Sequence, residues 1–193
     1  MSSQAAPNDS QTHAWQDDIF NVLKKGGIKQ VSYVPDAGHA HVIRRVHADP
    51  DMRGIVLTTE EEGVAIAAGA WLGGDRHALL MQSSGVGNCI NMMSLLDSCR
   101  FPFLSLVTMR GEYAEFNPWQ CPMGQATPAA LTLMGITVHR ANTADEVEDL
   151  VGAAVDAAFE TAIARYAGFL RSPSWELERG SLLRDLKGAA LRW

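Results

Sequence analysis

The fold of this chain is decided by one stretch, Gly54-Ile55-Val56-Leu57-Thr58-Thr59-Glu60-Glu61-Glu62-Gly63-Val64-Ala65-Ile66-Ala67-Ala68-Gly69-Ala70-Trp71-Leu72. Its first four residues favour a β-strand, and the residues from Glu60 onward favour a helix of small side chains. We expect Thr59 to cap this helix with Glu62 as its capping-box partner, which puts Glu60 in the first helical turn. A carboxylate after a strand suits proton transfer, although acidic residues at a helix start also complement the helix dipole without further function.

The same alternation of strand and helix continues on both sides of this stretch. We expect strands at 30–34, 54–57, 77–82, 103–108 and 137–140. Helices are expected at 15–23, 41–48, 60–72, 88–100 and 147–159, with another ending near 135. Thr143 and Glu146 form a second capping box, and 109–127 is a long, poorly periodic segment typical of a functional loop. The pattern predicts the α/β class, with a parallel sheet of about five or six strands and helices on both faces.

Length and composition limit the organisation of the chain. Its 193 residues fit one domain at 13–170, preceded by a disordered leader at 1–12 and followed by a divergent tail at 171–193. The net charge of −6 argues against nucleic-acid and membrane partners, and no stretch approaches the ~20 apolar residues of a membrane span. The three cysteines have neither metal-ligand nor disulfide-framework spacing, so they indicate reduced thiols and a cytoplasmic protein.

Candidate ligand contacts gather in the loops that follow the expected strands. Ser84-Gly85-Val86-Gly87-Asn88 joins a strand to a helix, so its backbone amides can approach a ligand, or its glycines simply form the turn. It is neither a dinucleotide fingerprint nor a P-loop. Arg110, beside Glu112 and Glu115, either recognises an anion or forms a solvated ion pair. His39-Ala40-His41 lacks further ligands, so we predict no metal site.

Four segments in the same order resemble the pyrimidine-binding domain of thiamine diphosphate-dependent decarboxylases. The family has a Gly nine residues after its catalytic Glu, as Gly69 follows Glu60, and then a Ser-Gly-x-Gly-x-x-Asn segment. Here that segment is one residue longer before its distal Asn, Asn91. Within the superfamily, the chain resembles the small alpha subunits of sulfopyruvate decarboxylase, and phosphonopyruvate decarboxylase. The additional matching segments are Val34-Pro35-Asp36, Arg110-Gly111-Glu112 and Asn117-Pro118-Trp119-Gln120 running to Gly124-Gln125.

The resemblance implies a function for these residues. Glu60 would be the catalytic residue and hydrogen-bond the pyrimidine ring nitrogen, while Ser84, Gly85, Val86, Gly87 and Asn88 would contact the cofactor. The substrate would be a small 2-oxo acid with a distal anion, sulfopyruvate first and phosphonopyruvate second. Arg110 would contact that anion, with Asp36 and His39 on the substrate side.

Two departures from the family lead to further expectations. The chain has no Gly-Asp-Gly motif, so the diphosphate and magnesium would be held by a beta-type partner subunit that carries it. The segment 162–170 differs from the apolar strand that closes such domains, which leaves the last strand open. The alternative from another class is a non-catalytic regulatory or binding subunit that keeps the fold.

Overall fold

The computed structural model describes residues 14–112, 115–160 and 166–171. The leader expected at 1–12 and the tail expected beyond Arg171 lie outside these residues. The strands are β1 (Ile28–Tyr33), β2 (Arg53–Val56), β3 (Arg76–Gln82), β4 (Phe103–Thr108), β5 (Thr137–Ala141) and β6 (Tyr166–Arg171). The α-helices are α2 (Ala14–Lys25), α3 (Ala40–Ala48), α4 (Glu61–Leu72), α5 (Ser83–Cys89), α6 (Ser94–Cys99), α7 (Cys121–Leu133) and α8 (Val147–Phe159). Two 3₁₀ turns, η1 (Pro118–Gln120) and η2 (Ala144–Glu146), precede α7 and α8.

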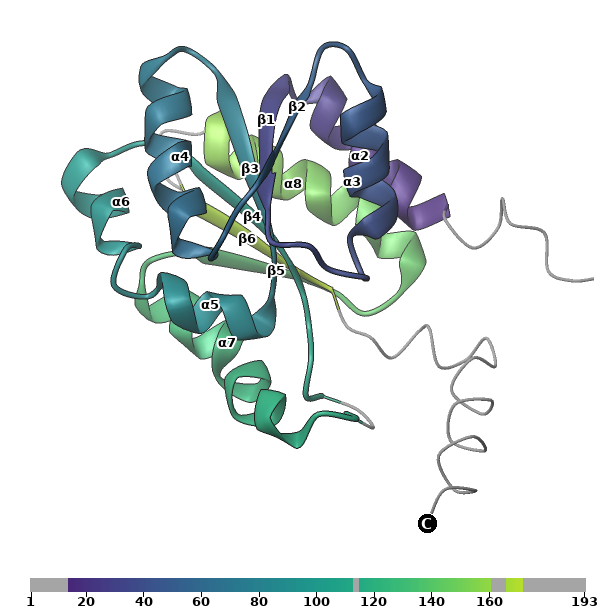
Figure 1. The fold of residues 1–193 in the computed structure, drawn as a ribbon, viewed down its shortest axis with the longest axis vertical. Helices are drawn as coiled ribbons and strands as arrows, with labels where there is room; N and C mark the ends of the chain where they lie inside the picture. Colours follow the sequence, from purple (N-terminus) through teal and green to yellow (C-terminus); the bar gives the residue numbers. More distant parts are fainter. Residues whose placement is uncertain (1–13, 113–114, 161–165, 172–193) are drawn as a thin grey trace, which may run out of the picture.

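Within the described residues, the six strands form one parallel sheet in the order β2-β1-β3-β4-β6-β5 (Figure 1). The chain moves from β1 outward to β2 and then returns to the other side of β1 for β3. This reversal creates a switch point, and in open parallel sheets ligands bind at the carboxyl ends of the strands beside such a point.

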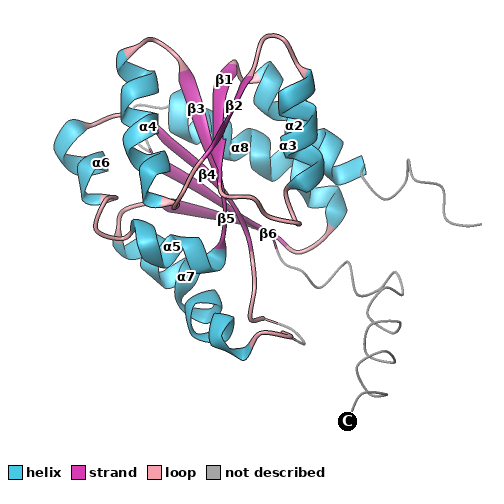
Figure 2. Ribbon diagram, in the orientation of Figure 1, coloured by secondary structure: helices cyan, strands magenta, loops and turns pink. Residues whose placement is uncertain are grey.

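Helices cover both faces of the sheet, as predicted (Figure 2). On one face, α2, α3 and α8 pack their apolar side chains against β1, β4 and β6. On the other face, α4, α5, α6 and α7 pack against β3 and β4. No helix among the described residues is long and apolar enough to cross a membrane.

The last strand of the domain, whose existence the sequence did not decide, is present as β6. It lies inside the sheet between β4 and β5, and its side chains Ala167, Phe169 and Leu170 are buried. The local sequence did not show it because a six-residue strand buried on both faces needs neither alternation nor flanking turn signals.

Two predictions in the segment after β3 are wrong. Residues 83–87 are the start of helix α5, not a loop, and the single helix expected at 88–100 is divided into α5 and α6. The backbones of Gly85 and Gly87 do not have positive φ. Close packing explains these glycines instead, since a Cβ on Gly87 would lie 3.0 Å from the sulfur of Met123 on α7. The expected long loop at 109–127 is also shorter, because η1 and α7 occupy 118–133.

The capping box predicted at Thr59 is wrong, whereas the one at Thr143 and Glu146 is confirmed. Helix α4 begins at Glu61 with Glu60 as its N-cap residue, and no side chain caps it. Glu62 instead accepts the backbone N–H of Thr58 at 2.9 Å. Glu60 is therefore one position earlier than expected, at the junction between strand and helix.

Candidate active site

Glu60 lies at the carboxyl edge of the sheet, where α4 faces the start of α5. One carboxylate oxygen, Oε2, accepts a hydrogen bond of 2.9 Å from Asn88 Nδ2. No donor among the described residues reaches the other oxygen, Oε1. The Glu60 side chain is half-buried, so a carboxylate with one oxygen positioned and one open is available at this edge.

The α5 residues predicted to contact a cofactor differ in how accessible they are. Gly85 lies directly against Glu60, since a Cβ on it would be 2.4 Å from Glu60 Cγ and 2.6 Å from Oε1. Gly87 and Asn88 are exposed and Ser84 is half-buried. The Val86 side chain is fully buried in the core, so it is not available to contact a cofactor. The glycine at 85 thus makes the space that Glu60 occupies.

Asp36 organises a buried polar network at the ends of β1, β3 and β4. Its carboxylate accepts hydrogen bonds of 2.7 Å from Gln82 Nε2 and from Thr108 Oγ1, and its Oδ2 lies 3.3 Å from Nδ1 of His39. Burial alone would raise the pKa of Asp36, but these contacts, led by His39, outweigh it and hold the pKa well below its usual range. Asp36 and His39 therefore lie together, and both side chains are almost fully buried.

Arg110 follows β4 and is tied to the same edge by its backbone. Its N–H donates to Ser83 Oγ at 3.0 Å, immediately before the α5 residues that flank Glu60. Its guanidinium donates from Nε and Nη2 to the two oxygens of Glu115, at 2.8 and 2.5 Å. Glu115 also accepts the backbone N–H of Gly111 and of Asn117. These contacts, foremost the hydrogen bonds from Arg110, lower the pKa of Glu115 to about 2.

Sequence reasoning missed Gln82 and Thr108 at this edge, and it considered Ser83 only as part of a loop expected at 83–88. Each is a polar residue in or just after a buried, apolar strand, and that position is the signal that could have found them. Glu115 was noted only as part of a charged loop.

Cys89, one residue after Asn88, is buried, and burial raises the pKa of its thiol to about 12, so it is not an activated nucleophile.

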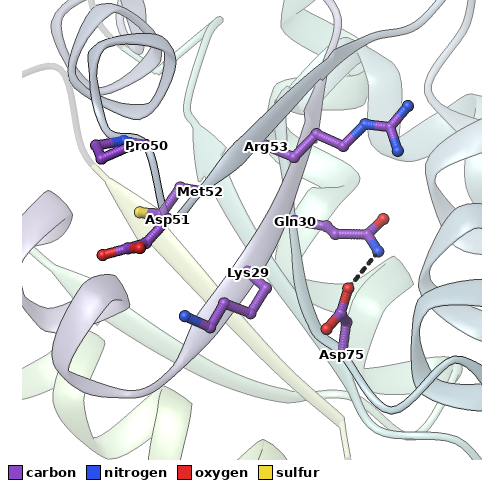
Figure 3. A pocket seen from close by; sticks show the side chains of 7 residues that line it. All are labelled: Lys29, Gln30, Pro50, Asp51, Met52, Arg53 and Asp75. Carbon is purple, nitrogen blue, oxygen red and sulfur yellow. Dashed lines mark hydrogen bonds between the residues drawn. The ribbon is translucent and has the colours of Figure 1, made fainter.

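A separate hollow of about 300 Å³ lies at the opposite, amino-terminal end of the strands (Figure 3). It is lined by Lys29, Gln30, Pro50, Asp51, Met52, Arg53 and Asp75. Its two cations are balanced by two carboxylates, and Gln30 Nε2 already donates to Asp75 at 2.7 Å. Because ligands of parallel sheets bind at the carboxyl ends, we assign no site to this hollow.

The chain is similar to curated proteins along most of its length. It is 37% identical over 134 residues to the sulfopyruvate decarboxylase subunit alpha of Methanococcus maripaludis, covering 69% of this chain and 80% of that subunit. The corresponding subunit of Methanothermobacter thermautotrophicus is 34% identical over 144 residues, covering 74% of this chain and 87% of the subunit. The chain belongs to the family of sulfopyruvate decarboxylase alpha subunits.

A further similarity, to part of a larger protein, agrees with this family. The phosphonopyruvate decarboxylase of Streptomyces viridochromogenes is 39% identical over 118 residues, which cover 60% of this chain but only 30% of that protein. No protein-family model matches the chain. Among solved structures, a 2-oxoglutarate:ferredoxin oxidoreductase from Magnetococcus marinus aligns with a TM-score of 0.62 at 12% identity, covering 82% of this chain and 28% of that one. At that identity it supports the fold alone.

Proposed function

We propose that this chain is the pyrimidine-binding subunit of a thiamine diphosphate-dependent sulfopyruvate decarboxylase, which converts sulfopyruvate to sulfoacetaldehyde and carbon dioxide. The observation that carries the proposal is Glu60. Its Oε2 is held by Asn88, while Oε1 is open at the carboxyl edge, beside a glycine that leaves room for it. The similarity to alpha subunits over about 70% of the chain supports the substrate.

The residues present fit the pyrimidine half of the cofactor. Glu60 offers an acceptor oxygen for a protonated ring nitrogen, and the exposed α5 residues Gly87 and Asn88 offer a small-residue surface beside it. When bound, thiamine diphosphate supplies an electron sink for the carbon–carbon bond that breaks on decarboxylation. The part of this chain is to orient the pyrimidine ring and to hold a proton at Glu60 Oε1.

A beta-type subunit with the Gly-Asp-Gly motif completes the enzyme in this proposal. It would hold the diphosphate and magnesium, for which this sequence has no motif. The substrate side of the site would be formed by Asp36, His39 and Arg110 from this chain. The odd number and the spacing of the cysteines support a cytoplasmic enzyme.

Co-expression of the chain with a beta-type subunit tests the proposal. We expect the purified chain alone to be inactive, and the complex to release carbon dioxide from sulfopyruvate when thiamine diphosphate and magnesium are added. The assay compares sulfopyruvate with phosphonopyruvate, since relatives of both kinds match the chain. Substantial turnover by the chain alone would refute the two-subunit enzyme. A complex that forms but never turns over a 2-oxo acid would favour the regulatory-subunit alternative.

A further inference from the structure

Arg110 has hydrogen-bonding capacity that its contacts in the protein do not use. A guanidinium carries five N–H donors in a planar fork. Glu115 takes one from Nε and one from Nη2, which together form one edge of the group. The other edge, formed by Nη1 and the outer N–H of Nη2, meets no acceptor among the described residues. The side chain is 31% exposed, so this open edge is accessible from solvent.

Glu115 is fixed before any ligand arrives. Its carboxylate accepts four hydrogen bonds, two from Arg110 and one each from the backbone of Gly111 and Asn117. Its side chain is only 6% exposed. Gly111 has a φ of +74°, which allows the turn that brings its N–H to the carboxylate. The backbone N–H groups of Gly111 and Asn117 therefore hold Glu115, and Glu115 in turn orients the guanidinium.

Arg140 provides a contrast on β5, which β6 separates from β4. It donates from Nη1 and Nη2 to the two oxygens of Glu112, at 2.7 and 2.8 Å, and from Nε to Asn142 at 3.1 Å. Arg140 therefore pairs with a carboxylate through its Nη1–Nη2 edge, which is the edge that Arg110 leaves open. Two arginines with similar exposure, 31% and 35%, thus differ in whether a paired edge remains for an anion.

We propose that the open edge of Arg110 binds the distal sulfonate of the substrate, and that Glu115 is the positioning residue that turns this edge toward it. The inference rests on the proposed function and names the specificity-determining contact of the same site. Paired N–H donors match two oxygens of a tetrahedral oxyanion, as in arginine–phosphate pairs. Because Glu115 neutralises the charge of Arg110, the selectivity comes from directed hydrogen bonds more than from net charge. A point-charge ammonium cannot reproduce that geometry.

The position of Arg110 agrees with this role. Its N–H binds Ser83, the first residue of α5, and the α5 residue Gly85 contacts Glu60. Its carbonyl is held equally tightly, since a Cβ on Gly124 would lie 1.8 Å from it. The backbone that carries the guanidinium is therefore fixed against α5, which also contacts Glu60, and against α7.

Binding to the co-expressed complex tests the inference without turnover. Isothermal titration calorimetry would compare 3-sulfopropionate, which resembles sulfopyruvate without its keto group, with propionate, which lacks the sulfonate. We expect Arg110→Lys to weaken 3-sulfopropionate by about tenfold or more, the usual effect of losing a charge-assisted hydrogen bond. Propionate should change less than about twofold. The control Arg140→Lys should leave the affinity for both probes unchanged.

Glu115→Gln separates positioning from competition. If Glu115 positions Arg110, this variant weakens 3-sulfopropionate and raises KM for sulfopyruvate more than it lowers kcat. Tighter binding would show that Glu115 competes with the ligand and would overturn its positioning role. Equal losses for both probes in Arg110→Lys would place Arg110 on the carboxylate and overturn the sulfonate site, as would no loss at all. Activity without these effects refutes only this inference, whereas selective binding without any decarboxylation refutes the proposed function.

Discussion

Glu60 differs from its two acidic neighbours in what its carboxylate contacts. Glu61 accepts the hydroxyl of Thr59, and Glu62 accepts the backbone N–H of Thr58 at 2.9 Å. Both stabilise the start of α4 and have a local structural function. Glu60 contacts Asn88 on another helix and keeps one oxygen open. The sequence of three glutamates alone could not separate these functions, because the difference depends on where α5 lies.

Glu60→Gln should therefore remove most activity of the complex while leaving its assembly intact. Gln retains the volume and can hydrogen-bond, but it cannot exchange a proton, so we expect kcat to fall by about 10²–10⁴-fold. Glu61→Gln and Glu62→Gln should lose far less, since capping and dipole effects are worth about 1 kcal/mol of helix stability. Steady-state kinetics with sulfopyruvate measures the contrast. Equal, mild effects at all three positions would leave Glu60 as an ordinary residue of the helix start.

Glu115 should make the stability of the fold sensitive to acid. Its pKa is lowered from 4.5 to about 2, so the folded state binds its proton less readily than the unfolded chain does. The stabilisation is fully present above pH 4.5 and is lost as the pH falls toward 2. Urea unfolding of the wild-type chain and of Glu115→Gln should show a difference in free energy of unfolding at pH 7 that shrinks across this window. A difference independent of pH would show that the carboxylate charge is not involved.

At the scale of elements, the packing of α7 against the segment that follows β4 depends on a glycine in close contact. Gly124 in α7 lies against the backbone of Arg110, where an added Cβ would come within 1.8 Å of the carbonyl oxygen. Gly124→Ala should destabilise the chain by about 1–3 kcal/mol or more, because backbone must move. Gly152→Ala in α8 is the control, since no atom in the described part of the chain lies within 4 Å of its Cβ position. That change should stabilise by about 0.5–1 kcal/mol. Denaturant unfolding would measure both, and a neutral Gly124→Ala would contradict the close packing.

Most elements could be predicted because their signals are local. The apolar strand β4 has the predicted bounds, and the stripe of α8 follows its capping box as expected. The errors arise where tertiary contacts decide. Small residues at 83–87 suggest a turn by composition, yet they are helical, and the space that Gly85 and Gly87 leave is filled by the side chains of Glu60 and Met123. Likewise, the pairing of Arg110 with Glu115 rather than with Glu112 depends on the turn at Gly111.

For the whole molecule, the outer surface of α4 is the face that we expect to meet the partner subunit. One side of the small-residue helix is committed to its own core, since Gly63, Val64, Ala67 and Ala70 are buried. A bulky residue at Ala67 would therefore damage the fold before it affected an interface. The outward residues Ala65, Gly69 and Leu72 are exposed on the same helix that begins beside Glu60. An interface that covers this surface as far as the N-terminal end of α4 would remove Glu60 from water, as its proposed chemistry requires.

Gly69→Trp tests this face, because no atom of the residues that the structure describes lies within 4 Å of a Cβ at that position. The isolated variant should fold normally, with an unchanged unfolding midpoint apart from the helix-propensity effect. Its affinity for the beta-type subunit should fall by about tenfold to a hundredfold, which corresponds to the 1–3 kcal/mol that overpacking typically costs. Leu133→Glu is the control, since Leu133 is 84% exposed at the far end of α7. Analytical ultracentrifugation of the mixed subunits measures both dissociation constants. If Gly69→Trp assembles as the wild type does, or if Leu133→Glu is the variant that dissociates, the outer surface of α4 is not the interface, and Glu60 must be shielded from water by another surface.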